Sequence, residues 1–164
     1  MKANAMLYVV CIMPFILTGA FAHGWVSVSM RCENHLRRLN YAIMKYAEHN
    51  KWILPKAKTF QELKEKIEPY LVDNNYDVIT VCPEGGAFFR NPDEYIWNPN
   101  LSGKPFSEMV GDIYSLNLDN KEPPLQCPYH KLERAKHAFR TAITAPDSPL
   151  VEYEKYLSEK NQNQ

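Results

Sequence analysis

Two short stretches of the chain bring together side chains that could do chemistry. VCPEGGAFF spans Val81–Phe89 and QCPYH spans Gln126–His130, and each contains a Cys-Pro pair. Thiols with an imidazole can hold a zinc ion, a thiol beside a histidine can act as a nucleophile, and two thiols can form a disulfide. The surroundings of these residues in the sequence favour one of the three uses.

A zinc site is one interpretation of Cys82, Cys127 and His130. His35 or His137 would have to supply a fourth ligand. Structural zinc usually takes ligands from two close pairs, and here only Cys127 and His130 form such a pair. A catalytic thiol needs an oriented base, and nothing around Cys82 resembles that arrangement. The sequence therefore predicts no metal ligand, no catalytic residue and no cofactor-binding residue.

The first thirty residues bear on the choice, because they are almost uniformly apolar. Lys2 is the only formally charged side chain before Arg31, and residues 5–22 read AMLYVVCIMPFILTGAFA. Residues 5–28 could cross a membrane, which takes about 20 apolar residues. Alternatively, Ala20-Phe21-Ala22 fits a signal peptidase site, with cleavage after Ala22. Both interpretations place the rest of the chain outside the cytoplasm.

Outside the cytoplasm, thiols oxidise and disulfides persist. We therefore predict a disulfide between Cys82 and Cys127, with Gly85 and Gly86 making the turn of a hairpin. In the chain-entropy model a loop of this length contributes roughly 4 kcal/mol. Cys32 is left without an assigned pair.

Helical periodicity indicates the elements that position these residues. Arg31–Asn50 carries apolar residues at intervals of three and four, which predicts a helix with one core-facing stripe. The stripe consists of Cys32, Leu36, Leu39 and Ile43. Thr59 and Glu62 form a capping box that begins a second helix, ending near Tyr70.

The second half of the chain is predicted to be richer in loops. Tyr76–Cys82 and Ala87–Phe89 read as two strands joined at the glycines, and Ile113–Leu118 reads as a weak strand. Helices are expected over Lys131–Thr144 and, at the end, over Leu150–Leu157.

Composition excludes one class of function. The 164 residues carry 19 basic and 19 acidic side chains, so no basic excess points to nucleic acid. No pattern indicates a small-molecule substrate.

Taken together, these pieces resemble type IV pilin-like proteins, including the pseudopilins of type II secretion. An apolar N-terminus leads into RCENHLRRLNYAIMKYAEHNKWILP, and VCPEGGAFF and QCPYH resemble the family's Cys-Pro-x-Gly-Gly-x-Tyr and Cys-x-x-His segments. The resemblance covers about residues 6–130. It does not extend to the processing site, where Val10 stands in place of the family's glutamate.

The resemblance implies an α+β fold in which a long N-terminal helix, part membrane and part amphipathic, packs on a small antiparallel sheet. The expected organisation is a leader or anchor over 1–30, a pilin-like domain over 31–145 with a loop-rich, disulfide-stapled C-terminal half, and a tail over 146–164.

The implied function is that of a non-catalytic structural component of a secretion or pilus-type apparatus. Such a protein would be anchored in the membrane through residues 5–28, with other pilin-like subunits as partners. Two alternatives stay open: a secreted binding domain released after Ala22, and a small exported enzyme or metal module that uses Cys82, Cys127 and His130.

Overall fold

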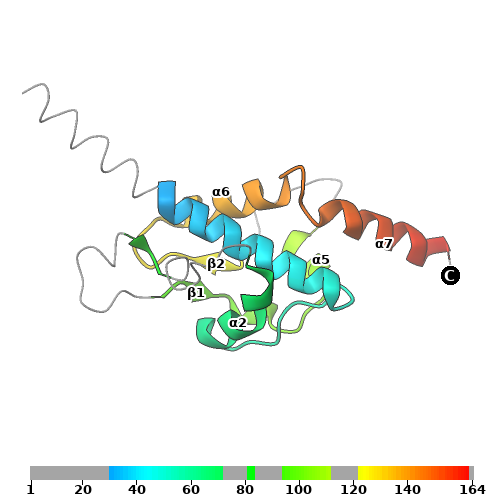
Figure 1. Ribbon diagram of the computed structural model, residues 1–164, viewed down its shortest axis with the longest axis horizontal. Helices are drawn as coiled ribbons and strands as arrows, with labels where there is room; N and C mark the ends of the chain where they lie inside the picture. The colour runs from blue at the N-terminus through cyan, green and yellow to red at the C-terminus, as the bar shows by residue number, and fades with distance from the viewer. Residues whose placement is uncertain (1–29, 72–80, 84–93, 112–121, 163–164) are drawn as a thin grey trace, which may run out of the picture.

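The computed structural model describes residues 30–71, 81–83, 94–111 and 122–162 (Figure 1). The predicted membrane segment 5–28, the glycines at 85 and 86 and the strand predicted over 113–118 lie outside these ranges. The named elements are α2 (Phe60–Ile67), η1 (Glu68–Tyr70), β1 (Ile96–Trp97), η2 (Pro99–Leu101), α5 (Phe106–Val110), β2 (Leu125–Gln126), α6 (Leu132–Ile143) and α7 (Leu150–Gln162).

A further helix occupies residues 30–49 within the described part of the chain. Cys32, Leu36, Leu39 and Ile43, the four residues of the predicted stripe, are fully buried. The chain leaves the helix through Lys51 and Trp52, which both have positive φ. The Trp52 N–H donates to the Ala47 carbonyl at 2.7 Å, and the Asn50 side-chain amide donates to the Tyr46 carbonyl.

Helix α2 begins at the predicted capping residue. The Thr59 side chain accepts a hydrogen bond from the Glu62 N–H at 3.2 Å, while the Glu62 carboxylate accepts from the Lys58 N–H at 2.8 Å. The reciprocal bond of the box is therefore made one residue earlier than the standard pattern. Phe60, Leu63 and Ile67 form the buried face of the helix.

The described sheet consists of two short antiparallel strands. Ile96 is opposite Gln126 and Trp97 is opposite Leu125. Just before β1, Glu94 forms an isolated antiparallel bridge with Val81. The segment 94–97 therefore pairs both with Val81, which precedes Cys82, and with β2, which precedes Cys127.

The C-terminal helix α7 packs against the core through one buried side chain. Helix α7 extends to Gln162, and its Tyr153 is buried with ring centroids 4.8 Å from Trp52 and 4.9 Å from Phe106. The segment that carries Trp52 is held by hydrogen bonds to the start of α5, including the Phe106 N–H donating to the Trp52 carbonyl.

The fold is helix-rich α+β with a small antiparallel sheet. One hydrophobic core includes residues from helix 30–49, α2, both strands, α5, α6 and α7. None of the helices within the described ranges has the length and apolarity needed to cross a bilayer.

Candidate functional site: a buried Cys3His cluster

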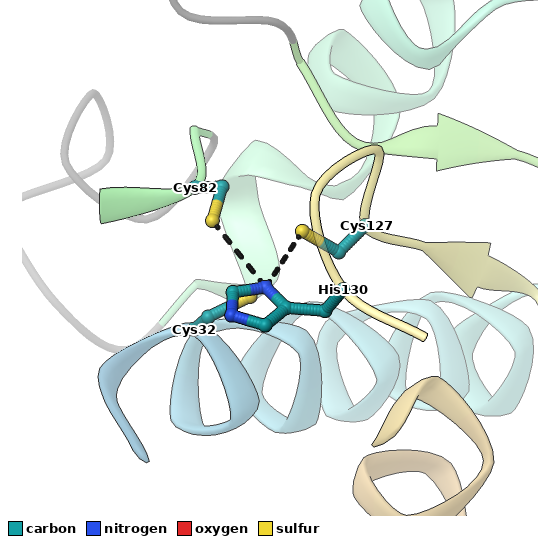
Figure 2. Close-up of side chains that lie close together, drawn as sticks. All are labelled: Cys32, Cys82, Cys127 and His130. Atoms are coloured by element: carbon teal, nitrogen blue, oxygen red, sulfur yellow. Dashed lines mark hydrogen bonds between the residues drawn. The ribbon is translucent and has the colours of Figure 1, made fainter. Parts of the chain in front are cut away.

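Three cysteines and a histidine from distant parts of the chain converge at one end of helix 30–49 (Figure 2). The three sulfurs of Cys32, Cys82 and Cys127 and one ring nitrogen of His130 all lie within 4.8 Å of one another. Among the described residues this is a compact set of the atom types that soft metal ions prefer.

Each ligand atom is positioned by a different local structure. Cys32 is held by the first described turns of helix 30–49, on its buried face. Cys82 follows the Val81–Glu94 bridge, and Cys127 directly follows β2. The cluster therefore depends on backbone pairing to the shared segment 94–97.

His130 enters the cluster through a short loop between β2 and α6. Its Nδ1 lies 3.1 Å from the Cys127 sulfur and 3.7 Å from the Cys82 sulfur, as the dashed lines in Figure 2 show. Cys127 and His130 are separated by two residues, which is the short ligand spacing typical of structural zinc sites.

The cluster lies inside the protein. Cys32 and Cys82 are 0% exposed and Cys127 is 6% exposed, while His130 is partly exposed. Tyr95, 1% exposed, donates its hydroxyl to the Cys32 sulfur at 3.7 Å. Burial of this kind favours a structural use of the thiols, because a nucleophile must be reached by its substrate.

Hydrogen bonding and burial raise the pKa of two of the thiols, Cys32 and Cys127. The pKa of Cys32 is raised chiefly by its hydrogen bonds with Cys127 and Cys82, and burial adds to this. The hydrogen bond with Cys32 lowers the pKa of Cys127, but the hydrogen bond with Cys82 and burial outweigh it and raise this pKa to about 11. A bound cation reverses this preference, because a coordinating thiol is deprotonated outright.

The disulfide predicted between Cys82 and Cys127 is not formed in the structure. Within the described residues, Cys32, Cys82 and Cys127 all remain thiols. The prediction paired the two cysteines that share a Cys-Pro context. It treated Cys32 as part of an apolar stripe, although the same stripe turns its sulfur toward the other two.

The other histidines considered as ligands are not part of the cluster and make other contacts. The ring nitrogen Nδ1 of His35 is 3.4 Å from the Val81 carbonyl oxygen, and that of His137 is 2.7 Å from a carboxylate oxygen of Glu33. Cys32 and Tyr95 are the residues that sequence reasoning missed. The predicted disulfide left Cys32 over, in a chain that also contains the Cys-x-x-His segment Cys127–His130. That leftover cysteine was the signal that could have pointed to Cys32 as a further ligand.

Comparison with known proteins adds no relative: no family model, no curated protein and no solved structure matches this chain.

Proposed function

We propose that the chain is a non-catalytic structural protein: a small pilin-like domain carried outside the cytoplasm by an N-terminal membrane anchor. The observation that carries this proposal is helix 30–49, which follows the apolar segment 5–28 in the sequence with one residue between them. Its stripe from Cys32 to Ile43 is fully buried in the domain core. A helix placed in this way would join an anchor to a globular head.

The chemistry of the molecule supports a structural role. The thiols and the imidazole that could have served catalysis are gathered in a mostly buried cluster (Figure 2). Because such a cluster holds three chain segments together, we expect it to stabilise the head. The partners of the proposed protein would be other pilin-like subunits.

Membrane fractionation after an alkaline wash tests the anchor. We expect the full chain to stay in the membrane pellet. Replacing Phe15 and Leu17 by Asp should move it to the supernatant, because charged side chains are costly in the bilayer core. The matched control is Lys66→Asp, a charge change at an exposed position of α2, which should leave the protein in the pellet.

The runner-up is a secreted binding domain released after Ala22. A hollow of about 600 Å³ between helix 30–49 and the end of α6 favours it, with Arg37, Arg38 and Tyr41 among its lining residues. N-terminal sequencing of the mature protein separates the two. A soluble product that begins at His23 would show that the protein is secreted and would rule out the membrane anchor.

A further inference from the structure

We propose that Cys32, Cys82, Cys127 and His130 bind one structural zinc ion. This inference goes beyond the anchored structural role and does not depend on it, because the cluster lies wholly within described residues of the head. Sequence analysis left a metal module with Cys82, Cys127 and His130 open as an alternative, and the structure adds Cys32 as the fourth ligand.

The spacing of the ligand atoms fits a tetrahedral zinc. With Zn–S near 2.3 Å and Zn–N near 2.0 Å, the sulfur and nitrogen atoms of a tetrahedral Cys3His set stand roughly 3.5–3.8 Å apart. The two distances from His130 Nδ1, 3.1 Å to the Cys127 sulfur and 3.7 Å to the Cys82 sulfur, lie close to this range. All four ligand atoms lie within 4.8 Å of one another. The most distant atoms would therefore move about an ångström closer together when zinc binds.

The ligand types select the ion. Three thiolates and an imidazole form a soft set that suits zinc and offers nothing to Mg²⁺ or Ca²⁺, which take oxygen ligands. Four protein ligands fill a tetrahedral shell, so no position is left for a water or a substrate. That is the arrangement of structural zinc, in contrast to catalytic sites that keep one position open.

Binding is a proton-coupled exchange without a redox step. The three thiols each lose a proton to solvent, the neutral imidazole donates its lone pair, and zinc takes four bonds. The occupied site carries a net charge of minus one. The Tyr95 hydroxyl, which donates to the Cys32 sulfur, supplies a hydrogen bond to this charge from within the core.

Tyr95 is therefore a positioning residue of the site. Tyr95 directly precedes β1 and Cys127 directly follows β2, and the two strands pair antiparallel, so the backbone that presents the tyrosine also helps to place this ligand. Outer-shell partners of this kind typically change metal affinity by about 10- to 100-fold when removed. The same hydrogen bond should alter the electron density on the Cys32 thiolate.

Metal analysis of the full chain, purified in detergent and reductant, tests the proposal. We expect one zinc per chain, lost on replacing His130 by Ala and kept in His130→Cys, which restores a four-ligand set. The matched control is His137→Ala. His137 pairs with Glu33 outside the cluster, so this variant should retain the zinc. Cys11→Ser, in the leader, should retain it as well.

Cobalt substitution reports directly on the ligands and geometry of the bound metal. Tetrahedral Co²⁺ with thiolate ligands gives strong visible absorption and a sulfur-to-cobalt charge-transfer band. Both should appear in the wild-type chain. Tyr95→Phe should shift the charge-transfer band and weaken zinc binding about 10- to 100-fold. Tyr41→Phe, whose hydroxyl donates to the Asp147 carbonyl far from the cluster, should do neither.

Two results would overturn the zinc site, and a third would overturn the role assigned to Tyr95. One is substoichiometric zinc that is equal in the wild type and in His130→Ala. Another is a metal-free folded protein in which two of Cys32, Cys82 and Cys127 react with alkylating agents only after reduction, which would establish a disulfide instead. An unshifted cobalt spectrum in Tyr95→Phe would remove the tyrosine from the site while leaving the zinc in place.

Discussion

Leu39 illustrates what the buried stripe contributes at the scale of a single residue. It is fully buried at the centre of helix 30–49. Leu39→Ala removes three buried carbons and leaves a cavity, so it should lower the free energy of unfolding by about 2–5 kcal/mol. Denaturant unfolding at fixed excess zinc measures this loss without a contribution from altered metal occupancy.

Val151→Ala is the matched comparison for Leu39→Ala. Val151 is 62% exposed on α7 and should change the unfolding free energy by no more than about 0.5 kcal/mol. A loss that small at Leu39 would mean that its side chain faces a partner or solvent, against the burial described above.

Cys32 shows where residue-level reasoning succeeds and where it stops. Its place in a three-and-four repeat predicts a core-facing side chain, and the side chain is buried. Cysteine behaves as a small apolar residue in such a stripe, so the pattern gives no reason to treat the sulfur as a ligand. Its neighbours in space, Cys82 and Cys127, are brought in by backbone pairing between distant segments. The periodicity of a single segment contains no information about such a pairing.

At the scale of an element, Thr59 determines where α2 begins. Its hydroxyl satisfies the Glu62 N–H, one of the helix's first unpaired donors. Thr59→Ala should therefore reduce stability by about 1 kcal/mol. Urea or guanidinium unfolding of the two proteins measures the difference, with no change expected in the zinc content.

Thr141→Ala is the same substitution inside a helix. The Thr141 hydroxyl donates to the His137 carbonyl, whose place in the α6 backbone ladder does not depend on it. Alanine has the higher helix propensity, so this control should be neutral or slightly stabilising. Equal losses at positions 59 and 141 would argue against a specific cap at Thr59.

Local sequence signals determine which elements could be predicted from sequence. The helices α2 and α6 have caps or clear periodicity, and they lie within the ranges predicted. Strands β1 and β2 contain two residues each, which is too short for an alternating pattern to be recognised. The left-handed exit through Lys51 and Trp52 contains no glycine. It is compensated by burial of the Trp52 ring among Phe106 and Tyr153, and such tertiary packing has no local signature.

At the scale of the whole molecule, the cluster ties together three segments that the sequence keeps apart. Cys32 lies near the first described residue of its helix, the end that follows the apolar leader. A zinc ion at this position would fasten the head to the helix beside the proposed anchor. The aromatic contact of α7 with Trp52 fastens the other end of the same helix, where the chain leaves it.

Metal and fold should then be thermodynamically linked. A ligand that binds the folded state alone stabilises it by about 1.4 kcal/mol for each tenfold rise in its free concentration above the dissociation constant. Unfolding of the full chain in zinc buffers, with reductant present, should follow that slope. Magnesium at the same concentrations should leave the unfolding free energy unchanged, because the ligand set contains no oxygen.

His130→Ala provides the decisive comparison for this linkage, because it leaves three thiols in place and removes one ligand. Its stability should depend much less on free zinc, so the two stability curves should converge as zinc is removed. Parallel curves would mean that zinc acts at another site. A wild-type unfolding free energy that does not change with zinc, and that is higher when the reductant is left out, would mean that a disulfide joins these segments. The two outcomes are distinguishable because zinc holds thiolates and a disulfide holds none, so reductant destabilises the second state alone.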